Sequence, residues 1–195
     1  MKDKYSDVIK KFTPYGPIPH EEWEALTSLL VRKEIAAGDY FENAGNLASE
    51  FCYVEKGLFR SFYRNGNGDE FIKNFAFEGQ LLGSFTSLLT AKPSELSIQA
   101  IESSIILVLD YKIFLDFFQR HRCWETGARL IAEYVFMESE RKEHQLLIYN
   151  AAERYDIFIK SHSHILKRIH QYMIAMYLGI SPVSLSRIIN NPARS

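Results

Sequence analysis

Short apolar and aromatic segments separated by glycines make up the chain from about Leu29 to Leu109. Short strands at regular spacing, with turns between them, are typical of a small β-barrel or jelly roll. The sharpest turn is Arg-Asn-Gly-Asn-Gly-Asp at 64–69, where Asn-Gly supplies the positive φ that a tight hairpin requires. We therefore predict a β-roll in which residues 58–63 pair with 70–75. The predicted strands span 33–36, 40–41, 51–54, 58–64, 70–77, 97–100 and 105–109.

Helical periodicity flanks this roll on both sides. Residues 20–31 predict a leading helix that packs against the roll, residues 111–120 a short helix, and residues 124–150 a long one. Along the long helix, six side chains recur at alternating intervals of four and three, the heptad spacing of a dimer seam: Leu130, Tyr134, Met137, Arg141, His144 and Ile148. The alternative is one amphipathic helix packed on its own roll, with Ile131, Val135, Leu146 and Leu147 in its apolar stripe. The two arrangements are compatible, and we favour a homodimer.

The run 171–189 has the features of a helix-turn-helix. Ala175 is small enough to let two helices cross closely, and Gly179 can adopt the positive φ of the turn between them. Ser181 can cap the second helix, and Pro182 suits its first position. An ordinary helical hairpin is the simpler alternative, but all these features agree within one stretch. Apolar side chains also fall where such a unit is buried: Ile174, Leu178, Ile180, Leu185 and Ile188.

Charge is distributed unevenly, although the whole chain carries only −1. Asp156 is the last acidic residue; five lysines and arginines follow it, so this end carries about +5 and the remainder about −6. A basic end on an acidic body indicates phosphate contact by one module, and a solvated basic tail is the alternative. We predict that the C-terminal unit binds double-stranded DNA through Ser181, Val183, Ser184, Ser186, Arg187, Lys167 and Arg168.

Composition argues against several other classes of protein. At 195 residues and 47% hydrophobic, the chain can bury one domain core and a second, smaller one. Cys52 and Cys123 are its only cysteines, which rules out a disulfide scaffold, a cysteine-rich zinc site and a four-cysteine iron–sulfur cluster. No apolar run approaches a membrane span and the N-terminus lacks the pattern of a signal peptide. We therefore expect a cytoplasmic protein with no membrane partner.

The chain has no P-loop, GxSxG, HExxH or GxGxxG motif, and we do not expect an enzyme. His162 and His164 are two residues apart, cannot share a helix face and have no third ligand nearby. An exposed interdomain turn is therefore a better interpretation of this pair than a metal site.

The parts follow one another as a leading helix, a β-roll, a long helix and a helix-turn-helix. This order resembles the Crp/Fnr family of bacterial transcription regulators over nearly the whole chain. The resemblance rests on Ala-Gly-Asp-Tyr-Phe at 37–41, Tyr-Val-Glu-Lys-Gly at 53–57, Phe-Glu-Gly-Gln-Leu-Leu-Gly at 77–83 and Tyr-Leu-Gly-Ile-Ser-Pro-Val-Ser-Leu-Ser-Arg at 177–187. The family implies an effector-sensing roll that is coupled through the long helix to a DNA-reading dimer.

The resemblance implies an α+β fold in three parts. These are a cyclic-nucleotide-binding-like β-roll or jelly roll at 1–122, a dimerisation helix at 123–150 and a helix-turn-helix domain at 151–195. The last part is expected to be winged-helix-like but to lack most of its wing, because the sequence stops at Ser195, soon after the second helix.

The sensor departs from the cyclic-AMP-binding members of the family. Those carry a glutamate for the ribose and an arginine for the cyclic phosphate, and the matching positions here are Ser84 and Ser94. Without the guanidinium, the phosphate loses a charge-assisted contact of about 1.5–3 kcal/mol, so we predict that cyclic AMP is not bound in the usual way. The expected pocket holds either an unidentified small effector or core side chains, and the cofactor is unknown. Its residues are Phe71, Phe75, Leu82, Gly83, Ser84, Phe85, Thr86, Ser94, Val135 and Phe136.

The DNA-reading end departs as well. Well-known family members place an arginine and a glutamate near the start of the recognition helix, where Pro182 and Val183 stand here; the later arginine is kept as Arg187. Arg187 can read guanine bidentately or grip a phosphate. The alternative function is a small-molecule-binding or protein-interaction module whose helix-turn-helix no longer reads DNA.

Overall fold

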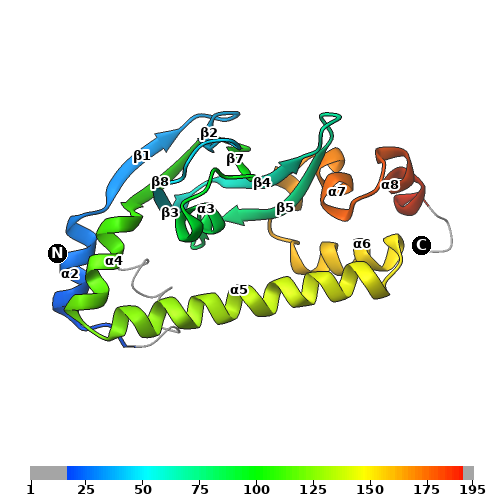
Figure 1. Cartoon of the computed structure of the whole chain (residues 1–195). Coiled ribbons are helices and arrows are strands. Elements are labelled where there is room, and N and C mark those ends of the chain that lie inside the picture. The colour runs from blue at the N-terminus through cyan, green and yellow to red at the C-terminus, as the bar shows by residue number, and fades with distance from the viewer. Residues whose placement is uncertain (1–16, 191–195) are drawn as a thin grey trace.

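The computed structural model describes residues 17–190 and shows a roll of two four-stranded antiparallel sheets (Figure 1). Sheet A has the order β1 (Val31–Ile35), β8 (Ser104–Asp110), β3 (Glu50–Lys56) and β6 (Leu81–Leu82). Sheet B has the order β2 (Tyr40–Glu42), β7 (Ser97–Ala100), β4 (Leu58–Arg64) and β5 (Glu70–Phe77). The strand-rich front half is confirmed, and β4, β5 and β7 have the predicted bounds. Strand β6 and the short helix α3 (Phe85–Thr90) are elements that the sequence does not predict.

The β4–β5 hairpin confirms the predicted pairing. Its turn is held by the side-chain oxygen of Asn65, which accepts hydrogen bonds from the backbone N–H groups of Asn67 (3.0 Å) and Asp69 (2.9 Å). The positive φ lies at Gly68 (90°), in the second Asn-Gly pair of the turn. In this turn, hydrogen bonds to the asparagine side chain thus replace some of the backbone hydrogen bonds of a tighter turn.

Side chains from the facing surfaces of the two sheets fill the interior of the roll. Val54, Phe59, Ile98 and Ile106 are fully buried there. Because neighbouring side chains on a strand point to opposite faces, the residues between them cover the outer surfaces of the sheets. Helices pack on those outer surfaces.

The outer face of sheet A is covered by α2 (His20–Ser28), α4 (Tyr111–Arg120) and the first half of α5 (Cys123–Ile148) (Figure 1). Trp23 of α2 and Trp124 of α5 meet edge to face, with ring centroids 5.9 Å apart. Helix α4 has the predicted bounds, whereas α2 ends earlier than predicted because Val31 already belongs to β1.

A second group of helices packs on β4 and β5 of sheet B: α6 (Ala151–Ser161), the 3₁₀ turn η2 (Leu166–Arg168), α7 (Gln171–Leu178) and α8 (Pro182–Ile189). Figure 1 shows α6 folding back along the end of α5 and α7 lying beside β5. Helix α6 is absent from the elements predicted from the sequence, although Asn150 and Glu153 form a complete capping box at its start. We call the buried cluster between hairpin and helices the docking core: Leu58, Phe62, Ile72, Phe75, Phe158, Ile165, Ile169, Met173, Ile174, Ala175, Leu178 and Leu185.

Helix α5 is continuous over 26 residues, close to the predicted range. Only Trp124 and Gly127 are buried along it, and Leu146 (49% exposed) and Leu147 (75%) do not pack on the roll as the single-helix alternative requires. Within residues 17–190, no helix by itself has the length and apolarity to cross a membrane. The bent pair α7–α8 reaches them only if its two helices are taken together.

Candidate functional site

Helices α7 and α8 meet at 105° across a three-residue turn, a geometry typical of a helix-turn-helix. Gly179 ends α7 in the left-handed region (φ 67°), and Ala175 is fully buried at the crossing. The Ser181 side chain accepts a hydrogen bond from the Ser184 N–H (3.1 Å), and Pro182 occupies the first turn of α8. The turn glycine, the serine cap and the N-terminal proline predicted for this stretch are therefore present, and Ile174, Leu178 and Leu185 are buried, whereas Ile180 and Ile188 are half-buried.

Helix α8 buries one face and presents the other to solvent. Leu185 is buried in the docking core, whereas Val183 is 62% exposed and Ser186 and Arg187 are also exposed. Ser184 is half-buried, and its hydroxyl lies 2.9 Å from that of Ser181. Arg187 forms no ion pair with any residue in 17–190. The predicted absence of a wing concerns residues 191–195 and lies outside the described residues.

Arg168 lies away from this exposed face and bridges the C-terminal helices to the roll. Its guanidinium donates to both carboxylate oxygens of Glu78 (2.8 and 3.0 Å) and to those of Glu102 (2.6 and 3.3 Å). Partial burial alone would raise the pKa of Glu78, but the hydrogen bonds from Arg168 and from the Gly57 N–H lower it to about 2. Lys167, the other predicted contact in η2, is exposed.

Ser84 and Ser94, the positions that match the glutamate and arginine of cyclic-AMP-binding proteins, are buried and hydrogen-bonded to each other. The hydroxyls of Ser84 and Ser94 lie 2.7 Å apart, and both residues are 4% exposed. Ser94 also donates to the Leu96 carbonyl (2.8 Å) and accepts from the Leu96 N–H (3.0 Å). Because a hydroxyl has one hydrogen, Ser84 is the donor in the pair. The two positions that would face a ribose and a phosphate form a closed, uncharged network.

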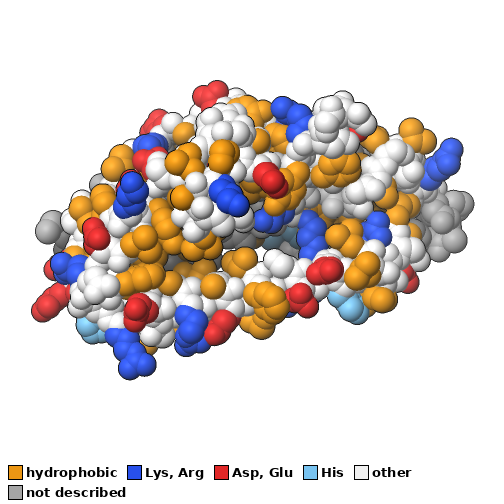
Figure 2. Space-filling model, in the orientation of Figure 1, with side chains coloured by type: hydrophobic (Ala, Val, Ile, Leu, Met, Phe, Trp, Pro, Cys, Tyr) orange, Lys and Arg blue, Asp and Glu red, His pale blue; other side chains and the backbone are white. Residues whose placement is uncertain are grey.

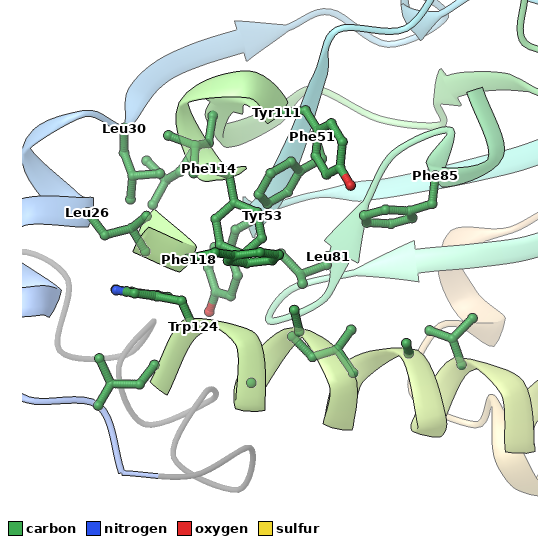
Figure 3. A pocket seen from close by; sticks show the side chains of 18 of the residues that line it. Leu26, Leu30, Phe51, Tyr53, Leu81, Phe85, Tyr111, Phe114, Phe118 and Trp124 are labelled. Atoms are coloured by element: carbon green, nitrogen blue, oxygen red, sulfur yellow. The ribbon is translucent and has the colours of Figure 1, made fainter. Parts of the chain in front are cut away.

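The ten residues predicted to surround one pocket are divided among several places. Phe85, Val135 and Phe136 line a cavity of about 400 Å³ between the outer face of sheet A and helices α2, α4 and α5 (Figure 3). Leu82 fills the roll interior, and Phe75 belongs to the docking core. Alternation along the strands explains the division, because residues close in sequence point into different cores.

The remaining predicted pocket residues do not line this cavity either. Phe71 is 46% exposed and Thr86 is also exposed. Gly83 lies against β3, where an added Cβ would come within 3.0 Å of the Phe51 Cβ. The described structure therefore brings only three of the predicted residues into this cavity, and the aromatic lining from α2, α4 and β3 is missing from the prediction.

The predicted seam of α5 is largely on the surface. Tyr134 (46% exposed), Met137 (57%) and Ile148 (65%) are apolar side chains in solvent, Arg141 and His144 are also exposed, and Leu130 is half-buried. Arg141 pairs with Glu138 at 2.8 Å on the same helix. Exposed apolar side chains in a row on one helix are unusual for an isolated surface helix.

Both thiols and His162 are at least partly buried. Cys52 is buried in the roll, where burial raises the pKa of its thiol, and Cys123 is half-buried. Both histidines lie in a turn, as predicted, and His164 is exposed; His162, in contrast, is half-buried and stacks on Phe158 with ring centroids 4.4 Å apart. Burial lowers the pKa of His162. No cluster of three metal-ligating side chains occurs in the described part of the chain.

Residues 32–121 match the cyclic nucleotide-binding domain family. No curated protein matches the sequence. Among solved structures, the chain is similar to FixK2 from Bradyrhizobium japonicum (TM-score 0.74, 15% identity, 85% of each chain covered) and to a putative crp/fnr-family transcriptional regulator from Eubacterium rectale (0.73, 15%, 90% of this chain and 86% of that one). The catabolite activator protein of Thermus thermophilus is also similar (0.60, 20%, 97% and 87%). These identities are low, so the similarity concerns the fold. Residues 32–121 are thus similar to cyclic nucleotide-binding domains, within a chain that has the α+β fold of Crp/Fnr regulators.

Proposed function

We propose that this protein is a DNA-binding transcription regulator of the Crp/Fnr type that binds DNA as a homodimer. The observation that carries the proposal is the exposed face of α8, on which Val183, Ser186 and Arg187 are free of the docking core. A capped helix at 105° to its predecessor can enter a major groove with its first residues. The excess of positive charge after Asp156 supports contact with phosphates.

Dimerisation through α5 accounts for its exposed apolar side chains. Tyr134, Met137 and Ile148 are at heptad spacing and would pair with the same residues of a second copy. A two-fold dimer carries two copies of α8, which suits two half-sites about one helical turn of DNA apart.

The roll is proposed to act as the sensor without taking cyclic AMP in the usual way. The hydroxyls of Ser84 and Ser94 are hydrogen-bonded to each other, and that of Ser94 also donates to the Leu96 carbonyl. Neither side chain carries the positive charge that would pair with a cyclic phosphate. The effector is therefore expected to have a different chemistry.

Selection of the purified chain against a random pool of duplex DNA tests the proposal directly. We expect a two-fold-symmetric motif, with binding that weakens steeply between about 50 and 200 mM salt. Weak binding without a motif, lost entirely with salt, would contradict sequence-specific regulation.

Arg187→Ala should weaken binding to the selected site by about 1–3 kcal/mol if the guanidinium reads a guanine. The preference at one base pair should relax at the same time. Arg122→Ala, in an exposed residue next to the start of α5, is the matched control and should bind normally. Unchanged affinity in Arg187→Ala would remove this residue from the interface.

Met137→Glu should convert the dimer to a monomer, because it places a charge in the middle of the apolar seam. Sedimentation velocity measures the change, and DNA affinity should fall with it. Gln119→Glu adds the same charge to an exposed position of α4 and should leave the dimer intact. A Met137→Glu protein that remains dimeric would exclude this seam.

A small-molecule-binding or protein-interaction module is the second candidate function. The observation that favours it is that Arg168 forms ion pairs with Glu78 and Glu102 rather than facing solvent beside α8, where it could contact a phosphate. Under this alternative, the DNA selection yields no motif while ligand binding to the roll persists.

A further inference from the structure

The cavity described above lies on the outer face of sheet A, and neither Ser84 nor Ser94 lines it. Phe51 and Tyr53 of β3 and Leu107 and Leu109 of β8 point outward into it, whereas the side chains between them fill the roll interior. Helices α2, α4 and α5 form its other walls. It is therefore a separate site from the hydrogen-bonded pair Ser84 and Ser94.

Its size is that of a ligand site rather than a packing defect. Protein interiors are close-packed, with few voids larger than a water molecule. A cavity of about 400 Å³ is within the range of small-molecule pockets and well above the roughly 150 Å³ that accommodates benzene. A three-ring aromatic molecule or an alkyl chain of about ten carbons is a suitable occupant at this scale.

The lining decides the chemistry of the occupant. Figure 3 shows the rings of Tyr53, Phe114, Phe118 and Trp124 gathered about one space, and no described lining residue carries a charge. The Trp124 indole N–H is already donated to Glu22 at 2.8 Å. An ion placed here would lose its hydration without gaining a partner, so a neutral molecule is strongly favoured.

The mouth of the cavity is apolar as well. Phe85 (37% exposed) and Leu89 (71%) on α3 face Val135 (51%) and Phe136 (65%) on α5. Figure 2 shows hydrophobic side chains gathered between α3 and the first half of α5, beside a hollow in the surface. Contiguous exposed apolar surface is typical of a binding site and is uncommon on the remaining surface of a folded protein.

We propose that this cavity binds an uncharged lipophilic small molecule. Since α5 forms one wall, the molecule would also be the effector of the regulator; this second statement rests on the proposed function, whereas the binding itself does not.

Tryptophan fluorescence gives a direct test, because the chain has two tryptophans and both line the cavity. The full chain is titrated with N-phenyl-1-naphthylamine, a neutral three-ring probe, and energy transfer from tryptophan is recorded. We expect saturable binding at about one site per chain with a Kd in the micromolar range. 1-Decanol should displace the probe, and decanoate, ionised at about pH 8, should do so at least about tenfold more weakly.

Two variants and one control locate the probe. Ala128→Phe fills the cavity from the α5 side and should weaken probe binding about tenfold or more, whereas Ala36→Phe makes the same change in an exposed turn and should not. Leu89→Arg places a cation at the solvent-exposed mouth. It should keep the neutral probe and improve decanoate binding about tenfold.

Absence of saturable probe binding would overturn the proposal, as would equal displacement by decanol and decanoate. Equal loss of binding in Ala128→Phe and Ala36→Phe would also overturn it, provided that both variants unfold at the denaturant concentration of the parent chain. No DNA is present in these titrations, so their outcome is independent of the DNA selection.

Discussion

The two groups of helices that pack on the roll do so in different ways. On sheet B, α6, α7 and α8 close over the β4–β5 hairpin around a solid core, in which Phe75 lies 6.1 Å from Phe158 and 5.8 Å from Tyr177 between ring centroids. On sheet A, α2, α4 and α5 enclose a cavity of about 400 Å³ with aromatic rings around its edge. One group is fixed by complementary packing, and the other leaves room for a molecule to enter.

The difference shows where the chain has rigid and adaptable contacts. Close packing defines a single arrangement of side chains, since any shift opens voids or creates overlaps. An element that borders a cavity loses less van der Waals contact energy when it moves, because part of its surface contacts no other atoms. The unit formed by α6, α7 and α8 is thus packed closely on the roll, whereas α5 is packed less closely where it passes the cavity.

Truncating one buried leucine on each side of the roll should have the largest effect on the free energy of unfolding, and it tests whether the two groups of helices are packed differently. Leu178 in the docking core is 2% exposed and Leu107 on the cavity wall is 1% exposed. Leu178→Ala should lower the free energy of unfolding by about 4 kcal/mol, and Leu107→Ala by about 2 kcal/mol, because Leu107 already faces empty space. Urea unfolding measures both, and equal losses would mean that the two attachments are packed alike.

Arg168→Met sharpens the comparison on the sheet B side. The guanidinium joins η2 to Glu78 and Glu102, but all three side chains are partly exposed, so we expect a loss of about 1 kcal/mol after solvent screening. The exposed neighbour Lys167→Met is the control and should cost less than about 0.5 kcal/mol.

The same ion pairs predict that the stability of the folded chain decreases at acid pH. The pKa of Glu78 is about 2 in the folded chain against 4.5 as its ordinary value. This stabilisation is complete above about pH 4.5 and is lost as the pH falls toward 2, because the folded state binds its proton later than the unfolded state. Arg168→Met should reduce the part of the acid sensitivity that arises from Glu78. An unchanged difference between the two proteins from pH 6 to 3 would argue against the pairing.

The smallest effect concerns Lys142, whose ammonium lies over the Tyr177 ring at 3.9 Å and donates to the Lys73 carbonyl. Burial, and then the charge of Lys73, lower the pKa of Lys142 to about 8. The unfolded state then binds more protons than the folded state above about pH 8, so stability should rise with pH up to about pH 9.5. Lys142→Met should remove this rise and Lys112→Met should not. A rise that persists in Lys142→Met would have another origin.

Features encoded within a few residues were predictable from the sequence. Asn65 and Gly68 define the hairpin, and Gly179, Ser181 and Pro182 define the α7–α8 turn, since each acts through its own backbone conformation or through a cap. Strands and helices with a strong hydrophobic periodicity were also predictable from the sequence. In contrast, β6 has two residues and α3 six, too few to show a period.

The candidate pocket depended on information that the sequence does not contain. Alternation along β3 and β5 shows that each strand has two faces, but not which helix covers which face. Phe75 therefore appeared suited to a sensor pocket, whereas it packs against α6 and α7. The cavity itself combines residues from Ile18 to Phe136, and a void between distant segments leaves no local pattern.

Helix α5 passes from the cavity at one end to α6 at the other without a break. At 1.5 Å per residue, its 26 residues measure about 39 Å, so a pivot of about 5° at the first turn sweeps the last turn through about 3 Å. A rigid lever of this length needs no internal rearrangement to transmit a change in tilt. In the proposed dimer, a modest displacement at the cavity wall would be magnified into a change in the spacing of the two α8 helices.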